Sequence, residues 1–170
     1  EIRKELQVRL KTAEDYLQRG MLVEASREFR MALSIDPENE PIREQLKELE
    51  RRLATKRSVV NDIRTAIASL QFENALQLWD RTPQDLRDEA LARQIEHLRT
   101  VVVPSLKLCE KGEQYEEQGR LEEAQASFQD ALQLDGNCER ARQGLADADR
   151  KIHRIEVMLK EGYEHSLKQD

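Results

Sequence analysis

The side chains in this sequence that bind transition metals most readily are three histidines and two cysteines. A zinc site needs three or four Cys, His, Asp or Glu ligands that the fold brings together, and two of them usually lie within one helical turn. His97, His153 and His165 are too widely spaced to share a turn, and Cys109 and Cys138 form no Cys-x-x-Cys pair. The sequence therefore predicts no metal site.

The acidic residues give no catalytic pattern either. Glu116 and Glu117, like Glu122 and Glu123, are adjacent in the sequence. On a helix, adjacent side chains diverge by about 100° and cannot converge on one substrate. No glycine-rich phosphate loop and no nucleophile elbow occurs. We therefore expect a protein that is not an enzyme and needs no cofactor. The two cysteines are read as small apolar fillers or as one disulfide, and both readings stay open.

The composition favours an all-helical protein. Of 170 residues, 36% are charged and 4% are aromatic, with only 6 Gly and 4 Pro. Ala, Leu, Glu, Gln and Arg, which are abundant here, are all good helix formers. A net charge of -6 argues against general nucleic-acid binding, which needs a basic face. The longest apolar runs are far shorter than the 18 residues of a membrane span, so no membrane insertion is expected.

The start of the chain resembles the interior of a longer protein. The sequence begins at Glu1, without methionine, inside a predicted helix. We interpret it as a fragment of a larger protein. Its lack of a targeting signal therefore leaves the localisation unknown, with only a weak preference for the cytoplasm.

One stretch organises the rest of the chain. It combines a small residue and an aromatic residue one helical turn apart, a glycine turn, an apolar stripe at helical spacing and a stop. This pattern predicts two antiparallel helices joined by a tight turn. In order, its residues are Ala13, Tyr16, Gly20, Leu22, Ala25, Phe29, Ala32, Asp36 and Pro37.

The same pattern returns twice. Gly112 to Asp135 repeats it 99 residues later, and a weaker copy lies midway, with Leu70 in place of the turn glycine and Trp79 in place of Phe29. A period near 50 residues predicts a stacked helical solenoid, in which one repeat cannot bury its apolar face alone. We expect one domain over residues 1–170, with repeats at about 5–54, 55–103 and 104–153, and a capping helix or further repeat at 154–170.

These residues resemble the tetratricopeptide repeat (TPR) family. That family's signature is a small residue, two residues, Tyr, then Gly-x-Leu-x-x-Ala, three residues, Phe and a closing Asp-Pro. The stretch from Ala13 to Pro37 matches it. Gly136 replaces the closing proline in the third repeat. The period exceeds the family's 34 residues, which implies extra helical length in each repeat. The resemblance implies a scaffold that binds segments of other proteins.

Caps and breakers set the expected helix bounds. Asn39 reads as an N-cap, and Thr82 followed by Pro83 reads as the start of a helix that breaks or kinks at Val103. The helices expected from these signals cover residues 2–18, 22–35, 40–69, 72–81, 83–103, 105–118, 121–134 and 137–169.

The resemblance also implies a binding surface. In that family the first helices of successive repeats line a groove for a protein or peptide partner. The predicted partner-binding positions are Leu10, Glu14, Leu17, Val60, Arg64, Ile67, Cys109, Glu113 and Glu116. The alternative is that the apolar members of this set are ordinary core residues.

A second function class remains open. The predicted helices at 42–69 and 141–162 carry apolar stripes with a spacing of about 3.5 residues, as in a coiled coil. Packing within one chain explains such stripes, but so does pairing between chains through residues such as Ile152 and Ile155. A homo-oligomeric structural rod is therefore the alternative to a binding scaffold. An enzyme would need a convergent polar pocket, which the sequence does not indicate.

Overall fold

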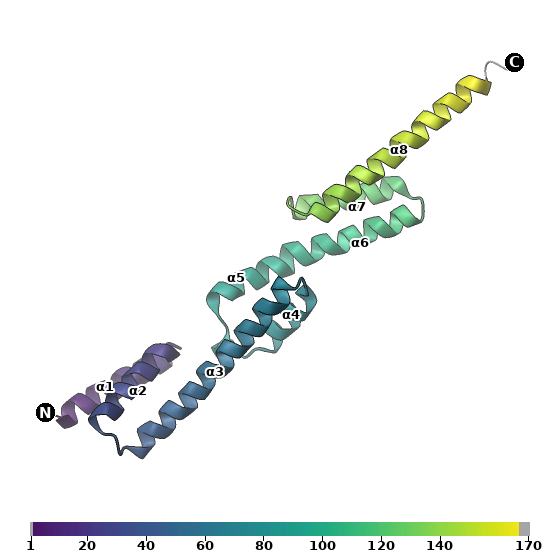
Figure 1. The fold of residues 1–170 in the computed structure, drawn as a ribbon. Coiled ribbons are helices and arrows are strands. Elements are labelled where there is room, and N and C mark those ends of the chain that lie inside the picture. Colours follow the sequence, from purple (N-terminus) through teal and green to yellow (C-terminus); the bar gives the residue numbers. More distant parts are fainter. Residues whose placement is uncertain (1, 167–170) are drawn as a thin grey trace. The chain divides into compact units, whose positions relative to one another are not determined.

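The protein is all-helical over the part that the computed structural model describes, residues 2–166, and no strand occurs in that range. This confirms the all-α prediction. The helices are α1 (Ile2–Gln18), α2 (Leu22–Ile35), α3 (Glu40–Ala68), α4 (Phe72–Arg81), α5 (Glu89–His97), α6 (Val103–Glu117), α7 (Leu121–Leu134) and α8 (Glu139–Ser166) (Figure 1). A 3₁₀ turn, η1 (Gln84–Leu86), precedes α5, and a π-helical turn, η2 (Leu98–Val102), follows it.

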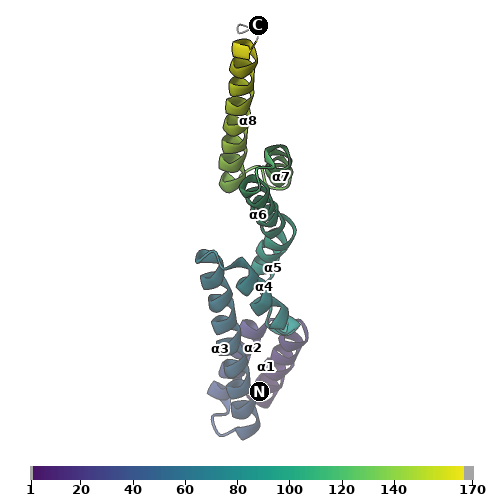
Figure 2. The same cartoon turned by 90° about the vertical axis from the view of Figure 1, so that its right-hand side faces the viewer.

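The chain divides into two compact units, unit 1 (Glu1–Ala92) and unit 2 (Arg93–Asp170). In unit 1, α1 and α2 form an antiparallel hairpin, and α3 packs first along α2 and then along α4 (Figure 1, Figure 2). Alanines at the helix crossings let the backbones approach closely, and Phe29 fills the space between them. The buried residues of this core are Ala13, Leu22, Ala25, Phe29, Ala32, Ile42 and Leu49.

Three turns with the same geometry end α1, α3 and α6. In each, a residue with positive φ follows the helix: Gly20 (71°), Leu70 (59°) and Gly119 (74°). The amide of the next residue donates to a carbonyl five residues back, as Met21 does to Tyr16 at 2.9 Å. This is the Schellman arrangement, which satisfies the last carbonyls of a helix and favours glycine. Leu70 adopts the same conformation with a leucine side chain.

The long helix α3 begins where the sequence predicts. The Asn39 side chain accepts a hydrogen bond from the Ile42 amide at 3.3 Å, and Pro41 lies in the first turn, where it costs no hydrogen bond. After Pro41, no glycine or proline interrupts this 29-residue helix. Its first half therefore covers α2, and its second half covers α4.

Two predictions about the following segment are wrong. Thr82 does not cap a helix start: its hydroxyl is buried and donates to the Leu78 carbonyl at 2.7 Å, which ends α4. Asp88 provides the cap six residues later, since its carboxylate accepts from the Leu91 amide at 2.9 Å. Of the two outcomes expected at Val103, a break or a kink, the break is wrong. That residue is helical, and the π-helical turn before it accommodates the missing amide of Pro104.

Unit 2 repeats the order of hairpin and long helix. α6 and α7 form the hairpin, and α8 packs on both before it extends beyond the N-terminus of α7 (Figure 1). Phe128 is fully buried at the centre of this core, and the Ser105 hydroxyl donates to the Ala131 carbonyl at 3.1 Å. The other buried members are Cys109, Ala124, Ala131, Cys138 and Ala141.

Candidate functional site

The predicted binding positions on α1 are split between core and surface. Leu10 and Leu17 are half-buried and pack against the core of unit 1, whereas Glu14 is exposed. The two leucines therefore serve packing first, as the alternative reading of these positions expects.

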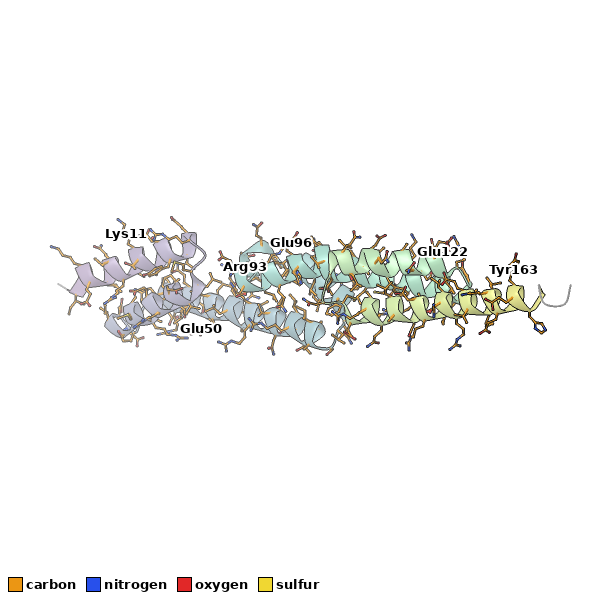
Figure 3. The ribbon with its side chains drawn as sticks, turned by 90° about the horizontal axis from the view of Figure 1, so that it is seen from above. Lys11, Glu50, Arg93, Glu96, Glu122 and Tyr163 are labelled. Carbon is orange, nitrogen blue, oxygen red and sulfur yellow. The ribbon has the colours of Figure 1, made fainter. Side chains whose placement is uncertain are left out.

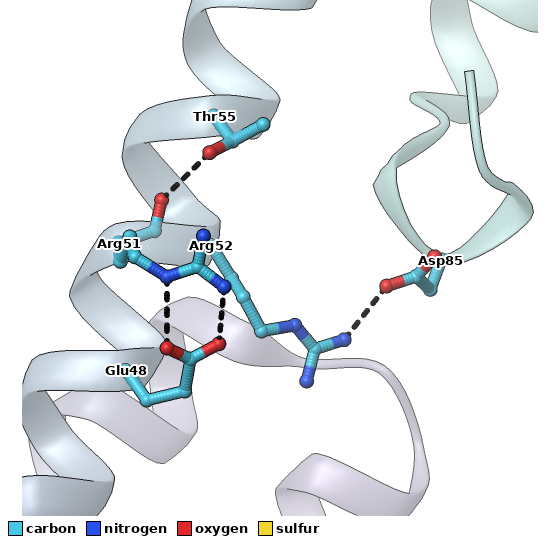
Figure 4. Close-up of polar contacts among 5 residues, drawn as sticks. All are labelled: Glu48, Arg51, Arg52, Thr55 and Asp85. Carbon is cyan, nitrogen blue, oxygen red and sulfur yellow. Dashed lines mark hydrogen bonds and ion pairs between the residues drawn. The ribbon is translucent and has the colours of Figure 1, made fainter. Parts of the chain in front are cut away.

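Leu17 also borders a shallow depression beside the N-terminal half of α3, with a volume of about 460 Å³. The ionic groups there are engaged within unit 1. Glu48 accepts two hydrogen bonds from Arg51, and Arg52 reaches Asp85 in η1 at 2.8 Å (Figure 4). The bond from Arg51 holds the pKa of the Glu48 carboxyl below its usual range. The Arg52–Asp85 pair joins α3 to the η1 turn, and the Glu48–Arg51 pair lies within α3, so little unsatisfied charge is left here for a ligand.

The predicted positions in unit 2 hold its helices together. Cys109 is fully buried, with its Sγ 3.7 Å from Sγ of Cys138, so its side chain is not available to a partner. Glu113 forms a 2.6 Å ion pair with Arg140 of α8, and the bond from this arginine lowers the pKa of Glu113.

Glu116 is likewise engaged, by Lys151 of α8 at 2.7 Å. Both carboxylates on α6 therefore lie beside basic residues of the long helix that covers them. Their charge is satisfied within unit 2, so neither presents a free acidic group to a partner.

The predicted positions on α3 lie in a different setting. Val60 and Arg64 line a groove between α2 and the C-terminal half of α3, with a volume of about 620 Å³. Ile67, one turn further, is half-buried and lies outside it. We call this feature the α2–α3 groove, and its lining residues are Val23, Ser26, Arg27, Arg30, Leu53, Lys56, Arg57, Val60, Asn61, Arg64 and Asp88.

Helix geometry explains how these residues meet. The lining positions on α2 recur at intervals of three and four residues, and those on α3 do so from Leu53 to Arg64. Each set is therefore one face of its helix. Along α3 the face covers three turns, roughly 16 Å at 1.5 Å per residue. Leu53 and Val60 are half-buried and supply the apolar surface of the groove, which we call its floor, whereas Arg57 and Arg64 alternate with them along the same face of α3 and are exposed. The α2 side of the groove, which we call its other wall, carries Arg27 and Arg30.

The walls of the groove carry unpaired positive charge. Of its five cations, Arg30 is paired with Glu50 of α3 at 2.7 Å. Among residues 2–166, no hydrogen bond or ion pair engages the other four, which we call the groove cations: Arg27, Lys56, Arg57 and Arg64. The one acid in the lining, Asp88, is partly committed to capping α5.

Sequence reasoning found Arg64 and Val60 but missed the other groove cations. Lys56, Arg27 and Arg57 are not among the positions that the resemblance to TPR proteins indicates. The signal that could have identified them is the helical spacing of basic residues on two adjacent helices, with Arg27 and Arg30 three apart and Arg57 and Arg64 seven apart.

A third surface lies on α8. Beyond α7 this helix exposes apolar side chains, with Ile155 at 47%, Leu159 at 69% and Tyr163 at 68% accessibility. The first two border a depression of about 390 Å³ beside Glu122 at the start of α7. The side chains of Glu122 and Tyr163 are labelled in Figure 3.

No protein-family model matches the chain, and no curated protein matches it. Within the described residues, no set of three or more His, Cys, Asp or Glu side chains is arranged to hold a metal ion. In the same range, each helix is too short or too polar to cross a membrane.

Proposed function

We propose that this chain is a non-catalytic helical-repeat module, similar to TPR proteins, that binds a segment of a partner protein. The repeat part of the proposal draws on the three Schellman turns. Gly20, Leu70 and Gly119 are 50 and 49 residues apart, and each follows the last turn of a helix. A common turn at a near-constant interval is typical of a solenoid whose repeats stack in series.

The binding part rests on one observation, the combination of an apolar floor and unpaired cations in the α2–α3 groove. A helix or extended segment that covers Leu53 and Val60 would remove apolar surface from water, which contributes roughly 25 cal/mol per Å². Polar groups around such a floor then select the orientation and sequence of the partner. Solvent alone would equally satisfy the charges, but it would not cover the floor.

Peptide display tests this proposal. A random peptide library is selected against the whole 170-residue chain, and affinities of the selected peptides are measured for two variants with unchanged circular dichroism. Val60→Asp places a charge in the floor of the groove, and Val8→Asp is the matched control on α1, where Val8 is 62% exposed. We expect an affinity loss of tenfold or more for Val60→Asp only. Peptides that bind both variants equally, or a selection that yields none, would contradict the groove.

A second candidate function is self-association of a structural rod through α8. The observation that favours it is the run of exposed apolar side chains from Ile155 to Tyr163. Such a strip is typical of helices that pair. Sedimentation equilibrium of the native chain and of Ile155→Glu tests it. A dimer that the substitution converts to monomer supports the rod, whereas a native monomer at high concentration excludes it.

A further inference from the structure

We infer that the α2–α3 groove selects an amphipathic helix that carries acidic residues on both sides of its apolar strip. This inference rests on the proposed function, which requires a protein segment in the groove but does not specify its charge. The positions of the groove cations supply that specification. Arg27 lies on the α2 wall, and Lys56, Arg57 and Arg64 lie on α3, next to Leu53 and Val60 on the same helix face.

The fold itself does not require this charge. Unit 2 has the same hairpin and long helix, with α7 and α8 each beginning 99 residues after α2 and α3. At the positions that correspond to Arg27, Lys56, Arg57 and Arg64 it has Ala126, Ile155, Glu156 and Tyr163. Both helix pairs pack, yet only one carries the cations. The positive walls are therefore a property of this groove and not of the architecture.

The ionic state of the groove favours an anionic occupant. Like charges that line one groove repel each other, and an apolar floor beneath them lowers the local dielectric constant and strengthens that repulsion. Elsewhere in unit 1, arginines such as Arg9, Arg51 and Arg52 are paired with carboxylates of the same chain. The four groove cations have no such partner among residues 2–166. Carboxylates supplied by a bound segment would relieve the repulsion and form charge-assisted hydrogen bonds.

The dimensions and the floor favour a helix over a polyanion such as DNA. Three turns of an occupant helix match the roughly 16 Å face of α3. Its apolar side chains at i, i+3 or i+4 and i+7 would lie on Leu53 and Val60. Acids one position to either side of that strip then face opposite walls. A nucleic-acid backbone would meet the cations but would leave the floor uncovered.

Three labelled peptides of about four helical turns test the inference. They share one apolar strip and differ only at the flanking positions, which are Glu, Gln or Lys. Fluorescence anisotropy with the whole chain should give a dissociation constant at least tenfold lower for the Glu peptide than for the Gln peptide, with an advantage that shrinks as salt is added.

Matched variants locate the effect. Arg57→Gln combined with Arg64→Gln should remove most of the Glu peptide's advantage. Arg51→Gln, which lies on another face of α3, should not. Replacing Arg27, Lys56, Arg57 and Arg64 together by Glu should reverse the preference, so that the Lys peptide binds best. That reversal cannot arise from unfolding.

The contradicting outcomes separate the two proposals. If the Gln peptide binds as tightly as the Glu peptide and Val60→Asp weakens both, the charge inference is wrong while the groove stands. If none of the three peptides binds, the charge inference is wrong. The proposal that the groove binds a partner is wrong as well only if the peptides selected by display bind the Val60→Asp variant as tightly as the native chain. A double-stranded DNA oligonucleotide that binds more tightly than the Glu peptide, and is insensitive to Val60→Asp, would overturn the choice of a protein ligand.

Discussion

The ring of Phe128 occupies the space that a side chain on Gly144 would need. A Cβ placed on Gly144 of α8 would lie 2.5 Å from Cε1 and Cζ of that ring, and a Cβ on Gly112 of α6 would lie 2.8 Å from the same atoms. Phe128 is fully buried on α7, so it cannot move aside into solvent. The two glycines therefore admit the ring between α6 and α8.

Gly144→Ala should destabilise the protein although alanine is the better helix former. Overpacking of a filled core typically costs about 1–3 kcal/mol, which exceeds the roughly 1 kcal/mol that alanine gains in helix propensity. Gly162→Ala on the same helix is the control, because a Cβ there meets nothing within 4 Å. We expect thermal unfolding to show a lower melting temperature for Gly144→Ala and an equal or higher one for Gly162→Ala. A gain for both would refute the close approach of Phe128.

The large aromatic residues anchor the two cores. Phe29 is 1% accessible and packs among alanines and the larger Leu22, Ile42 and Leu49, and Phe128 is fully buried among alanines and cysteines. Phe29→Ala and Phe128→Ala should each lower the free energy of unfolding by about 3–5 kcal/mol. Urea denaturation followed by circular dichroism measures the loss. A cost below about 1 kcal/mol for either variant would contradict its placement in the core.

The sequence predicts the helices well because local signals set their ends. Residues 2–18, 22–35, 72–81 and 121–134 form the helices expected from glycine turns, caps and apolar spacing. The prediction from sequence fails where tertiary packing determines which of two possible local structures forms. The Thr82 hydroxyl could cap either neighbouring helix, and burial against α4 selects the Leu78 carbonyl. A proline indicates irregular backbone but not whether the chain breaks or widens into the π-helical turn seen before Val103.

The predicted binding residues divide for a similar reason. Helical spacing places a residue on a face, but the packing of neighbouring helices decides which faces stay open. Leu10 and Cys109 lie on faces that other helices cover, whereas Val60 and Arg64 lie on one that remains open. Glu113 is predicted as a partner-binding position, but the basic residue that pairs with it, Arg140, is 27 positions away. Spacing within one helix gives no information on such a partner.

Leu70 offers a route to a more stable protein. Its φ of 59° is unfavourable for a residue with a Cβ, and its side chain is 75% exposed, so little packing offsets the strain. Leu70→Gly should raise the free energy of unfolding by about 1 kcal/mol, in line with Gly20 and Gly119 at the corresponding turns. Leu70→Ala keeps the Cβ and serves as the control, for which we expect little gain. Equal stability of all three proteins would show that the leucine conformation carries no strain.

Cys109 should make the protein less stable as the pH rises into the alkaline range. Burial, followed by the neighbouring Cys138, raises the pKa of the Cys109 thiol from 9.0 to about 12. The folded state therefore disfavours the thiolate. The resulting contribution to stability is complete below pH 9 and falls as the pH rises toward 12. We expect the native chain to lose unfolding free energy over this range more steeply than Cys109→Ala, as measured by urea denaturation at several pH values. Parallel pH profiles for the two proteins would contradict the raised pKa.

Iodoacetamide at pH 8 gives an independent test of the raised pKa, because a thiol with so small a thiolate fraction should be modified only after unfolding.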